Sequence, residues 1–230
     1  MDVNEAVKIV SDPHCLPTYD ELVKACLKFE INSKNMDNCL LWWAIIDKKE
    51  APVFEIWNSD YLDLFSKYLA SVKPKVIVEV GAGNGKLSHN LRQRLPEVKI
   101  VATDDASWNI EPVFAVENVE IVEALDKYCP DVVISSWMPY QHDWTPLFRA
   151  CKSVKEYILI GETDSGCCGS EETWGYSENG TASYKQEGFI RKDLEELERL
   201  QVCRTDHLCF EYGRTYRHSG TVSFARKQHE

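Results

Sequence analysis

Apolar runs and helix-like segments alternate along the chain from residue 75 onward. Buried strands are predicted where short apolar runs occur, at 76–80, 99–103, 119–122, 131–135 and 157–160. Helices are predicted between or after them, at 87–95, near Pro112, at 147–154 and at 190–200. Because parallel strands need long crossover connections, this alternation predicts a parallel sheet with helices on both faces.

The end of the chain departs from this alternation. Residues 206–212 and 221–226 have the pattern of strands, and the polar segment 213–220 between them is too short for a helix. Two strands joined by a short polar turn predict an antiparallel hairpin. The predicted fold class is therefore α/β with a C-terminal antiparallel hairpin.

The first 72 residues have a helical pattern. Thr18 and Glu21 have the spacing of a capping box, and a second helix is predicted from Asn58 or Ser59. The apolar run 40–46 is too short to cross a membrane, so it is expected to be buried. The segment ending at Trp57 comes just before the first strand and is expected to cover a pocket there. We predict one domain over 1–230, with a helical extension over 1–72 and a core over 73–230.

A glycine motif follows the first predicted strand. The segment Glu79-Val80-Gly81-Ala82-Gly83-Asn84-Gly85 connects this strand to a helix, and Asp104 follows Gly85 by 19 residues. A glycine turn between strand and helix lets a ligand approach the backbone closely, and Asp104 can accept hydrogen bonds from both ribose hydroxyls. Glu79 would repel a pyrophosphate but would attract a sulfonium and an ammonium. The motif therefore favours S-adenosylmethionine as the cofactor.

These residues resemble motif I and the acidic end of strand two, here Val101-Ala102-Thr103-Asp104, of the class I S-adenosylmethionine-dependent methyltransferases. The resemblance implies a Rossmann-like three-layer sandwich with five parallel strands and a final antiparallel strand. It implies methyl transfer from S-adenosylmethionine, with a cofactor site formed by Glu79, Gly81, Ala82, Gly83, Gly85, Asp104, Asp105, Glu123, Ala124, Leu125, Ser136 and Trp137. Two alternatives remain open, a non-catalytic binding module of the same fold and a nicotinamide-dependent enzyme, which Glu79 opposes.

Some members of the predicted cofactor set have a structural alternative. Glu123 would accept a hydrogen bond from the adenine amine while Leu125 packs on the ring, but Glu123 can equally be a solvated loop acid. Asp105 is more typical of a helix cap than of a second ribose ligand. Lys86 is unexpected beside a cationic cofactor and is predicted to point toward solvent.

The segment after the fourth predicted strand is rich in aromatic residues. It corresponds to motif IV of the methyltransferases, although only Pro139 and Tyr140 match, which disfavours nucleobase or glutamine methylation. Trp137, Tyr140 and Trp144 are expected either to hold a substrate amine by cation–π attraction or to belong to the core.

Three residues are candidates for the catalytic site. Tyr140 is expected to line the acceptor site, and His142, next to Asp143, is expected to accept the proton of the nucleophile. Because positioning supplies much of the barrier reduction for a reactive sulfonium donor, His142 can also be structural. Glu162, at the end of the fifth predicted strand, is expected to face the substrate.

Composition narrows the classes of partner. The formal net charge is −11, which disfavours a nucleic-acid substrate, so a small-molecule acceptor is predicted ahead of a protein side chain. No apolar run is long enough for a membrane span, and no secretory signal is seen at the start. Nine cysteines without a C-x-x-C pair, including the adjacent Cys167 and Cys168, indicate no metal site. The composition predicts a cytoplasmic protein with reduced thiols.

Overall fold

A seven-stranded mixed sheet forms the centre of the protein. The structure is a computed structural model and describes residues 1–30, 43–48, 51–164, 166–176, 180–206, 208 and 217–227. The strand order is β3-β2-β1-β4-β5-β7-β6, in which β1 to β5 are parallel and β7 runs antiparallel to both β5 and β6. The strands are β1 (Val76–Val80), β2 (Lys99–Asp104), β3 (Glu117–Asn118), β4 (Val132–Ser136), β5 (Glu156–Glu162), β6 (Phe189–Asp193) and β7 (Ser219–Arg226). The Rossmann-like fold class with an antiparallel hairpin is confirmed.

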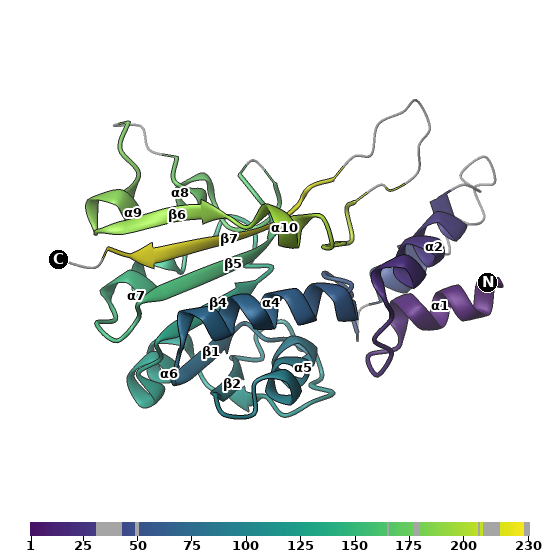
Figure 1. Ribbon diagram of the computed structural model, residues 1–230, viewed down its shortest axis with the longest axis horizontal. Helices are drawn as coiled ribbons and strands as arrows, with labels where there is room; N and C mark the ends of the chain where they lie inside the picture. Colours follow the sequence, from purple (N-terminus) through teal and green to yellow (C-terminus); the bar gives the residue numbers. More distant parts are fainter. Residues whose placement is uncertain are drawn as a thin grey trace.

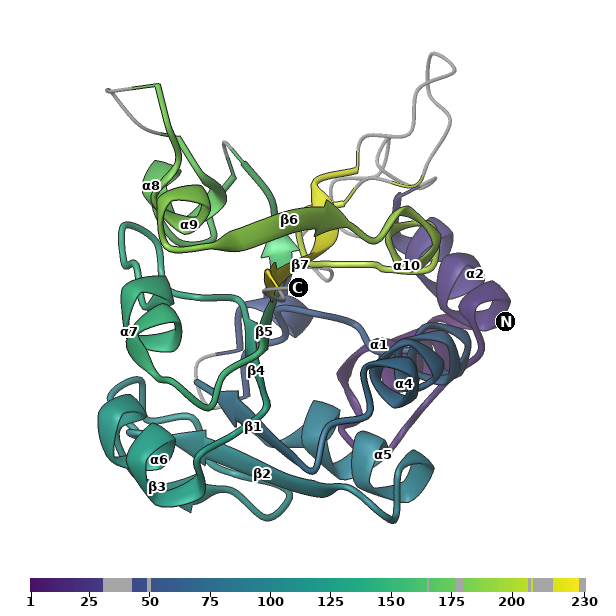
Figure 2. The same cartoon turned by 60° about the vertical axis from the view of Figure 1, so that its left-hand side comes forward.

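Helices cover both faces of the sheet, as Figure 2 shows. One face is covered by α4 (Ser59–Val72), α5 (Lys86–Arg94) and the short α10 (Glu195–Glu198). The other face is covered by α6 (Ile121–Tyr128), α7 (Thr145–Ala150) and the short helices α8 (Glu171–Trp174) and α9 (Ser183–Gln186). Successive residues of a strand point to opposite faces, so Ile77 packs under α4 and α5 whereas Val78 and Val80 pack with α6 and α7.

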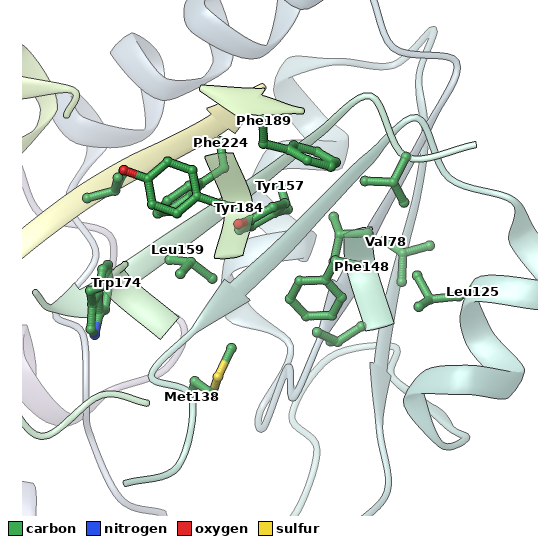
Figure 3. Close-up of a cluster of buried hydrophobic side chains, with 14 of the residues drawn as sticks. Val78, Leu125, Met138, Phe148, Tyr157, Leu159, Trp174, Tyr184, Phe189 and Phe224 are labelled. Atoms are coloured by element: carbon green, nitrogen blue, oxygen red, sulfur yellow. The ribbon is translucent and has the colours of Figure 1, made fainter. Parts of the chain in front are cut away.

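Aromatic rings fill the core on the α6 and α7 face (Figure 3). The ring of Tyr157 stacks on Phe224 with centroids 4.7 Å apart and also contacts Phe148 at 5.8 Å and Phe189 at 5.4 Å. These rings come from β5, β7, α7 and β6, so the cluster holds the antiparallel hairpin against the parallel strands. Burying each ring contributes roughly 1.5–3 kcal/mol.

The N-terminal residues form helices beyond the end of the sheet toward which the parallel strands point (Figure 1). Helix α1 (Val3–Ser11) packs on α2 (Tyr19–Glu30). The predicted capping box is confirmed, because Glu21 accepts hydrogen bonds from the backbone N–H and the hydroxyl of Thr18, both at 2.9 Å. Helix α4 begins after Asn58, whose side chain accepts from the Tyr61 N–H at 2.9 Å.

The apolar run near the start of the chain is only partly described. Within residues 43–46, which form a helical turn, Ile45 and Ile46 are buried against α1 and α2, whereas Trp43 is exposed. The rest of this run, 40–42, lies outside the described residues. In the part of the chain that the structure describes, no helix is both long and apolar enough to cross a membrane.

The predictions between β2 and β4 were wrong in two places. No helix forms near Pro112, where residues 105–116 are irregular. The predicted strand 119–122 is only the two-residue β3 at Glu117–Asn118, and the chain then enters α6. One face of α6 packs against the core. Ala124, Leu125 and Tyr128 follow Ile121 by three, four and seven residues, so all four lie on this face.

The first strand of the hairpin also differs from the prediction. Residues 190–193, expected to begin the helix 190–200, belong instead to the edge strand β6 (Phe189–Asp193), which pairs with β7. Phe189 is buried and Ile190 is exposed, which is the alternation of a strand, and helical structure begins only at α10. Of the predicted strand 206–212, residues 206 and 208 are in no strand and the others lie outside the described residues, as does the first half of the predicted turn, 213–216.

Candidate functional site

A cleft opens at the carboxyl ends of β1, β2 and β4, where ligands bind in open α/β sheets. It is lined by side chains from five segments, within 10–13, 51–57, 79–87, 104–113 and 136–144. The N-terminal extension therefore forms part of the wall, and the segment ending at Trp57 covers this cleft as predicted.

The glycine turn forms the floor of the cleft. Gly81 has a φ of +65°, and a Cβ there would come within 3.1 Å of the Trp144 ring. Gly85 has a φ of +78°, and a Cβ there would lie 2.6 Å from Val116. Residues that carry a Cβ are strained at such positive φ angles. Glycine therefore allows the turn at both positions and, at Gly81, the close approach of Trp144.

Asp104 lies directly beside this turn. Its Oδ2 accepts a hydrogen bond from the Gly83 N–H at 2.8 Å, and its Oδ1 accepts from the Ala106 N–H at 2.8 Å. Each carboxylate oxygen keeps a second lone pair, and Asp104 lines the cleft, so it can still accept from a ligand hydroxyl. The neighbouring Asp105 also lines the cleft, but its Oδ1 accepts from the Ser107 N–H at 2.9 Å and stabilises a turn rather than a helix. Hydrogen bonds from Ser107 lower the pKa of Asp105.

Glu79 is buried beneath the cleft, with 2% of its surface exposed. In β1 it points to the same face as Ile77, and its Oε2 accepts hydrogen bonds from the Ser88 N–H at 3.1 Å and the Ser88 hydroxyl at 2.5 Å. Burial raises the pKa of Glu79 to about 7, although the hydrogen bonds from Ser88 oppose this shift. A cation in the cleft would stabilise the ionised carboxylate.

Lys86 does not point toward solvent, so that prediction was wrong. Its side chain is 8% exposed, and Nζ donates to the carbonyl oxygen of Cys15 at 2.7 Å and to that of Asp12 at 3.5 Å. These carbonyls belong to the connection between α1 and α2, so Lys86 ties the N-terminal extension to the first turn of α5. Burial lowers the pKa of Lys86 to about 8.

Replacing Lys86 with methionine is expected to loosen residues 12–15 while leaving the sheet intact. The variant loses the two hydrogen bonds from the ammonium, and hydrogen bonds to charged groups contribute about 1.5–3 kcal/mol. Amide hydrogen exchange near Cys15 is therefore expected to accelerate at least tenfold, with exchange in β4 and β5 unchanged. Equal exchange rates near Cys15 in both proteins would show that the tie does not hold this segment.

The aromatic residues after β4 divide between the cleft and the surface. Trp137 and Trp144 line the cleft together with Ser136. Tyr140 is 63% exposed, and neither it nor His142, which is also exposed, lines the cleft. Of the three aromatic residues predicted to hold a substrate amine, Trp137 and Trp144 therefore line the cleft and Tyr140 does not.

The expected pairing of His142 with Asp143 is not formed. Oδ1 of Asp143 accepts hydrogen bonds from the Thr145 N–H at 3.1 Å and the Thr145 hydroxyl at 2.7 Å, at the start of α7. The carbonyl of His142 accepts from the Thr173 hydroxyl at 3.3 Å. These contacts hold the segment in place and leave the imidazole away from the cleft.

Glu162 is buried but does not line the cleft. Its carboxylate accepts from the Cys167 N–H, and a Cβ on Gly166 would collide with it. Burial raises the pKa of Glu162, but hydrogen bonds from Thr205 and Cys167 outweigh burial, so the pKa is lowered. Its contacts are those of a residue that holds the loop after β5.

The three residues expected to bracket adenine lie in α6 rather than after a strand. Glu123 is exposed, whereas Ala124 and Leu125 are buried in the core next to β1. Figure 3 shows Leu125 within this core cluster. None of the three lines the cleft, because helix α6 turns their buried face toward the sheet.

No protein-family model and no curated protein matches the sequence. Three solved structures with similar folds are all methyltransferases. An O-methyltransferase family protein from Burkholderia thailandensis is 9% identical with a TM-score of 0.43, over 88% of this chain and 63% of that chain. Magnesium protoporphyrin IX methyltransferase from Synechocystis PCC 6803, solved with bound S-adenosylmethionine, is 12% identical with a TM-score of 0.45, over 73% of this chain and 77% of that chain.

The third is the ribosomal protein L11 methylase from Lactobacillus delbrueckii subsp. bulgaricus, which is 14% identical with a TM-score of 0.38, over 73% of this chain and 78% of that chain. The chain thus spans less than two thirds of the length of the Burkholderia protein. The similarity to these proteins is one of fold. The function of the cleft is inferred from the residues that line it.

Several residues that line the cleft were not predicted from the sequence. Among them, Phe54 and Glu55 come from the wall segment 51–57, and Trp108 comes from the irregular segment after β2. The wall segment was expected to cover the pocket, but nothing in the stretch Val53-Phe54-Glu55-Ile56-Trp57 marks one acid as buried. Glu55 and Phe54 are held by Gln201 and Arg204, about 150 positions further along the chain.

Proposed function

We propose that the protein is an S-adenosylmethionine-dependent methyltransferase. The observation that carries this proposal is that the cleft above the glycine turn is lined mainly by acidic side chains. Among the described residues, the charged ones that line the cleft are six acids and one lysine, namely Asp12, Glu55, Glu79, Lys86, Asp104, Asp105 and Glu111. A dinucleotide would bring its pyrophosphate against these acids, whereas a sulfonium and an ammonium are attracted to them.

The cofactor residues that we propose have separate tasks. Asp104 accepts from the ribose hydroxyls, and Glu79 supplies negative charge beneath the positively charged end of the ligand. Gly81, Ala82 and Gly83 let the ligand approach the backbone, while Ser136 and Trp137 form the wall toward the acceptor. Gly85 does not line the cleft, and its task is to allow the turn into α5 at a φ of +78°. When bound, S-adenosylmethionine supplies a methyl group on a sulfonium, which a nucleophile displaces in line to leave S-adenosylhomocysteine.

Calorimetry with three ligands tests this proposal. S-adenosylmethionine and S-adenosylhomocysteine are expected to bind, because both place an adenosine over Asp104 and an ammonium near Glu79. NAD is expected to show no binding at concentrations that saturate the protein with S-adenosylhomocysteine. Tighter binding of NAD than of S-adenosylhomocysteine would reverse the assignment.

A non-catalytic binding module is the second candidate. It is favoured by the position of Tyr140 and His142, which were expected at the acceptor and instead face solvent. Methyl transfer to any acceptor in a broad mixture of metabolites and peptides, followed by release of S-adenosylhomocysteine, distinguishes an enzyme from such a module. A protein that binds the cofactor and transfers no methyl group would be the module.

A small-molecule acceptor fits this site better than a nucleic acid. The cleft is walled by 10–13 and 51–57, which narrows the approach to it. The net charge of −11 repels phosphate backbones on average. A protein side chain is the next alternative, and a cytoplasmic location stays a prediction.

A further inference from the structure

A buried acid, Glu55, lines the cleft beside Trp137. Glu55 is 8% exposed. Its backbone is held on both sides, because the Ile56 N–H donates to the carbonyl oxygen of Val202 at 2.9 Å and the Arg204 N–H donates to that of Phe54 at 2.9 Å. The wall segment is thus attached to the chain that follows α10, and Glu55 is fixed in place.

One oxygen of Glu55 is engaged and the other is available. Oε1 accepts from Nε1 of Trp137 at 2.8 Å and from Nε2 of Gln201 at 3.0 Å. Gln201 is itself oriented by the Thr221 hydroxyl, which donates to its Oε1 at 2.7 Å. Oε2 has no hydrogen-bond partner among the described residues. Glu55 lines the cleft, and because Oε1 is engaged, Oε2 is the oxygen left to accept from a ligand.

Aromatic residues line the cleft near Glu55. The ring of Phe54 lies 5.3 Å from Trp137 and 6.1 Å from Trp108, centroid to centroid, and the Arg204 guanidinium lies over one of its faces at 5.1 Å. Trp137 has a φ of +57°, which is unfavourable for a bulky residue. Its N–H donates to the carbonyl oxygen of Ile160 at 2.8 Å, and its indole donates to Glu55, so these two contacts hold the strained residue in place.

We propose that Glu55, Phe54 and Trp137 form the acceptor subsite, and that the acceptor is a small amine. Aromatic faces attract a cationic nitrogen, and a carboxylate accepts a hydrogen bond from it. The proposal rests on the methyltransferase function proposed above and adds to it the class of substrate. It also assigns to Glu55 the proton acceptance that was expected of His142.

The chemistry of the transfer balances with Glu55 as the proton acceptor. An amine that arrives as an ammonium ion gives one N–H proton to Oε2 of Glu55. The nitrogen lone pair then bonds to the methyl carbon while the carbon–sulfur bond breaks, and its electron pair returns to the sulfur as a thioether. The products are a methylated ammonium ion and S-adenosylhomocysteine, and Glu55 later releases its proton to water.

The electrostatic surroundings of Glu55 suit this task. Burial raises the pKa of Glu55 well above 4.5, hydrogen bonds from Trp137 and Gln201 oppose the shift, and the carboxylates of Asp206 and Glu162 add to it. Before a ligand binds, Glu55 therefore holds its proton more firmly than an exposed acid does. An ammonium ion favours the carboxylate form, so binding of an amine is expected to release a proton to the buffer.

Calorimetry with protein saturated in S-adenosylhomocysteine tests the subsite, using benzylamine and its uncharged counterpart benzyl alcohol as probes. Glu55→Gln keeps the oxygen that accepts from Trp137 and Gln201 but removes the charge. Glu97→Gln, an exposed acid in the turn before β2 that does not line the cleft, is the control. Benzylamine is expected to bind the wild type about tenfold or more tightly than Glu55→Gln, and equally to wild type and Glu97→Gln. Proton release, measured in two buffers of different ionisation enthalpy, is expected to vanish in Glu55→Gln.

The outcomes separate this inference from the proposed function. If S-adenosylhomocysteine binds but benzylamine does not, or binds Glu55→Gln as well as wild type, the amine subsite is wrong and the cofactor assignment stands. Equal binding of benzyl alcohol and benzylamine to wild type would also overturn it. If S-adenosylhomocysteine itself fails to bind, the proposed function falls, and the subsite falls with it. A cooperative thermal unfolding transition like that of the wild type confirms that Glu55→Gln is folded.

Discussion

Replacing Asp104 with alanine is expected to weaken binding of S-adenosylhomocysteine by about 1.5–3 kcal/mol, which is roughly tenfold to more than a hundredfold in the dissociation constant. The variant loses a charged acceptor for the ribose hydroxyls. It also loses the hydrogen bond from Gly83, which holds the glycine turn at 2.8 Å from Oδ2. Both losses act on the adenosine end of the ligand.

Titration calorimetry measures this effect, with thermal unfolding as the check that the variant is folded. Asp104→Asn separates the two roles, because its amide oxygen can still accept from Gly83 but carries no charge. Glu123→Ala is the matched control. Glu123 was expected to bind adenine but lies exposed on α6, so its removal is expected to leave the dissociation constant unchanged. An unchanged constant in folded Asp104→Ala would refute the cofactor assignment.

The sequence predicted the glycine turn and its surroundings well because these features are local. The observed bounds of β1 are the predicted ones, and α5 ends within one residue of the predicted stop near Pro96. Asp104 ends β2 next to β1, and the parallel pairing of Val80 with Thr103 brings its carboxylate to the turn. A strand, a turn and the neighbouring strand are enough to make this half of the site.

Contacts between distant segments could not be predicted in the same way. Lys86 is buried because the connection between α1 and α2 presents carbonyl oxygens to it from more than 70 positions away. Glu55 acquires its position from Trp137 and Gln201, which are 82 and 146 positions away. The sequence around each residue is ordinary, so only tertiary packing distinguishes it from a solvated surface charge.

The positions of Tyr140 and His142 were mispredicted because the backbone turns twice after β4. Trp137 and Gln141 both have positive φ angles, near +57° and +63°. These angles bend the chain so that Met138 takes a buried place while Tyr140 and His142 face solvent. Neither residue type signals such a conformation as glycine does, so the pattern after Ser136 gave no warning.

The pH dependence of folding through Glu79 is expected to be the other large effect. Burial raises the pKa of Glu79 from 4.5 to about 7, so the folded protein binds this proton more tightly than the unfolded chain. The resulting stability is fully present below pH 4.5 and is lost as the pH rises through about 7. The difference corresponds to about 3 kcal/mol in the free energy of unfolding.

Urea unfolding of the wild type and of Glu79→Gln, repeated between pH 5 and 8, isolates this contribution from all other titrating groups. The glutamine can still accept from Ser88 but does not ionise. The free energy of the wild type minus that of Glu79→Gln is expected to decrease by about 3 kcal/mol over this range. The matched control is Glu97→Gln, an exposed acid in the turn before β2, for which the difference is expected to stay flat.

Cofactor binding is expected to change the protonation of Glu79, and this change tests where the positive end of the ligand lies. A cation bound above Glu79 stabilises its carboxylate, so S-adenosylmethionine is expected to release a proton when it binds near pH 6 and to release none from Glu79→Gln. The wild-type protein saturated with S-adenosylmethionine should then lose less stability between pH 6 and 8 than the free protein. A flat difference between wild type and Glu79→Gln would show that Glu79 is already ionised before the cofactor binds. Proton uptake on binding would show that the positive end of the ligand lies elsewhere.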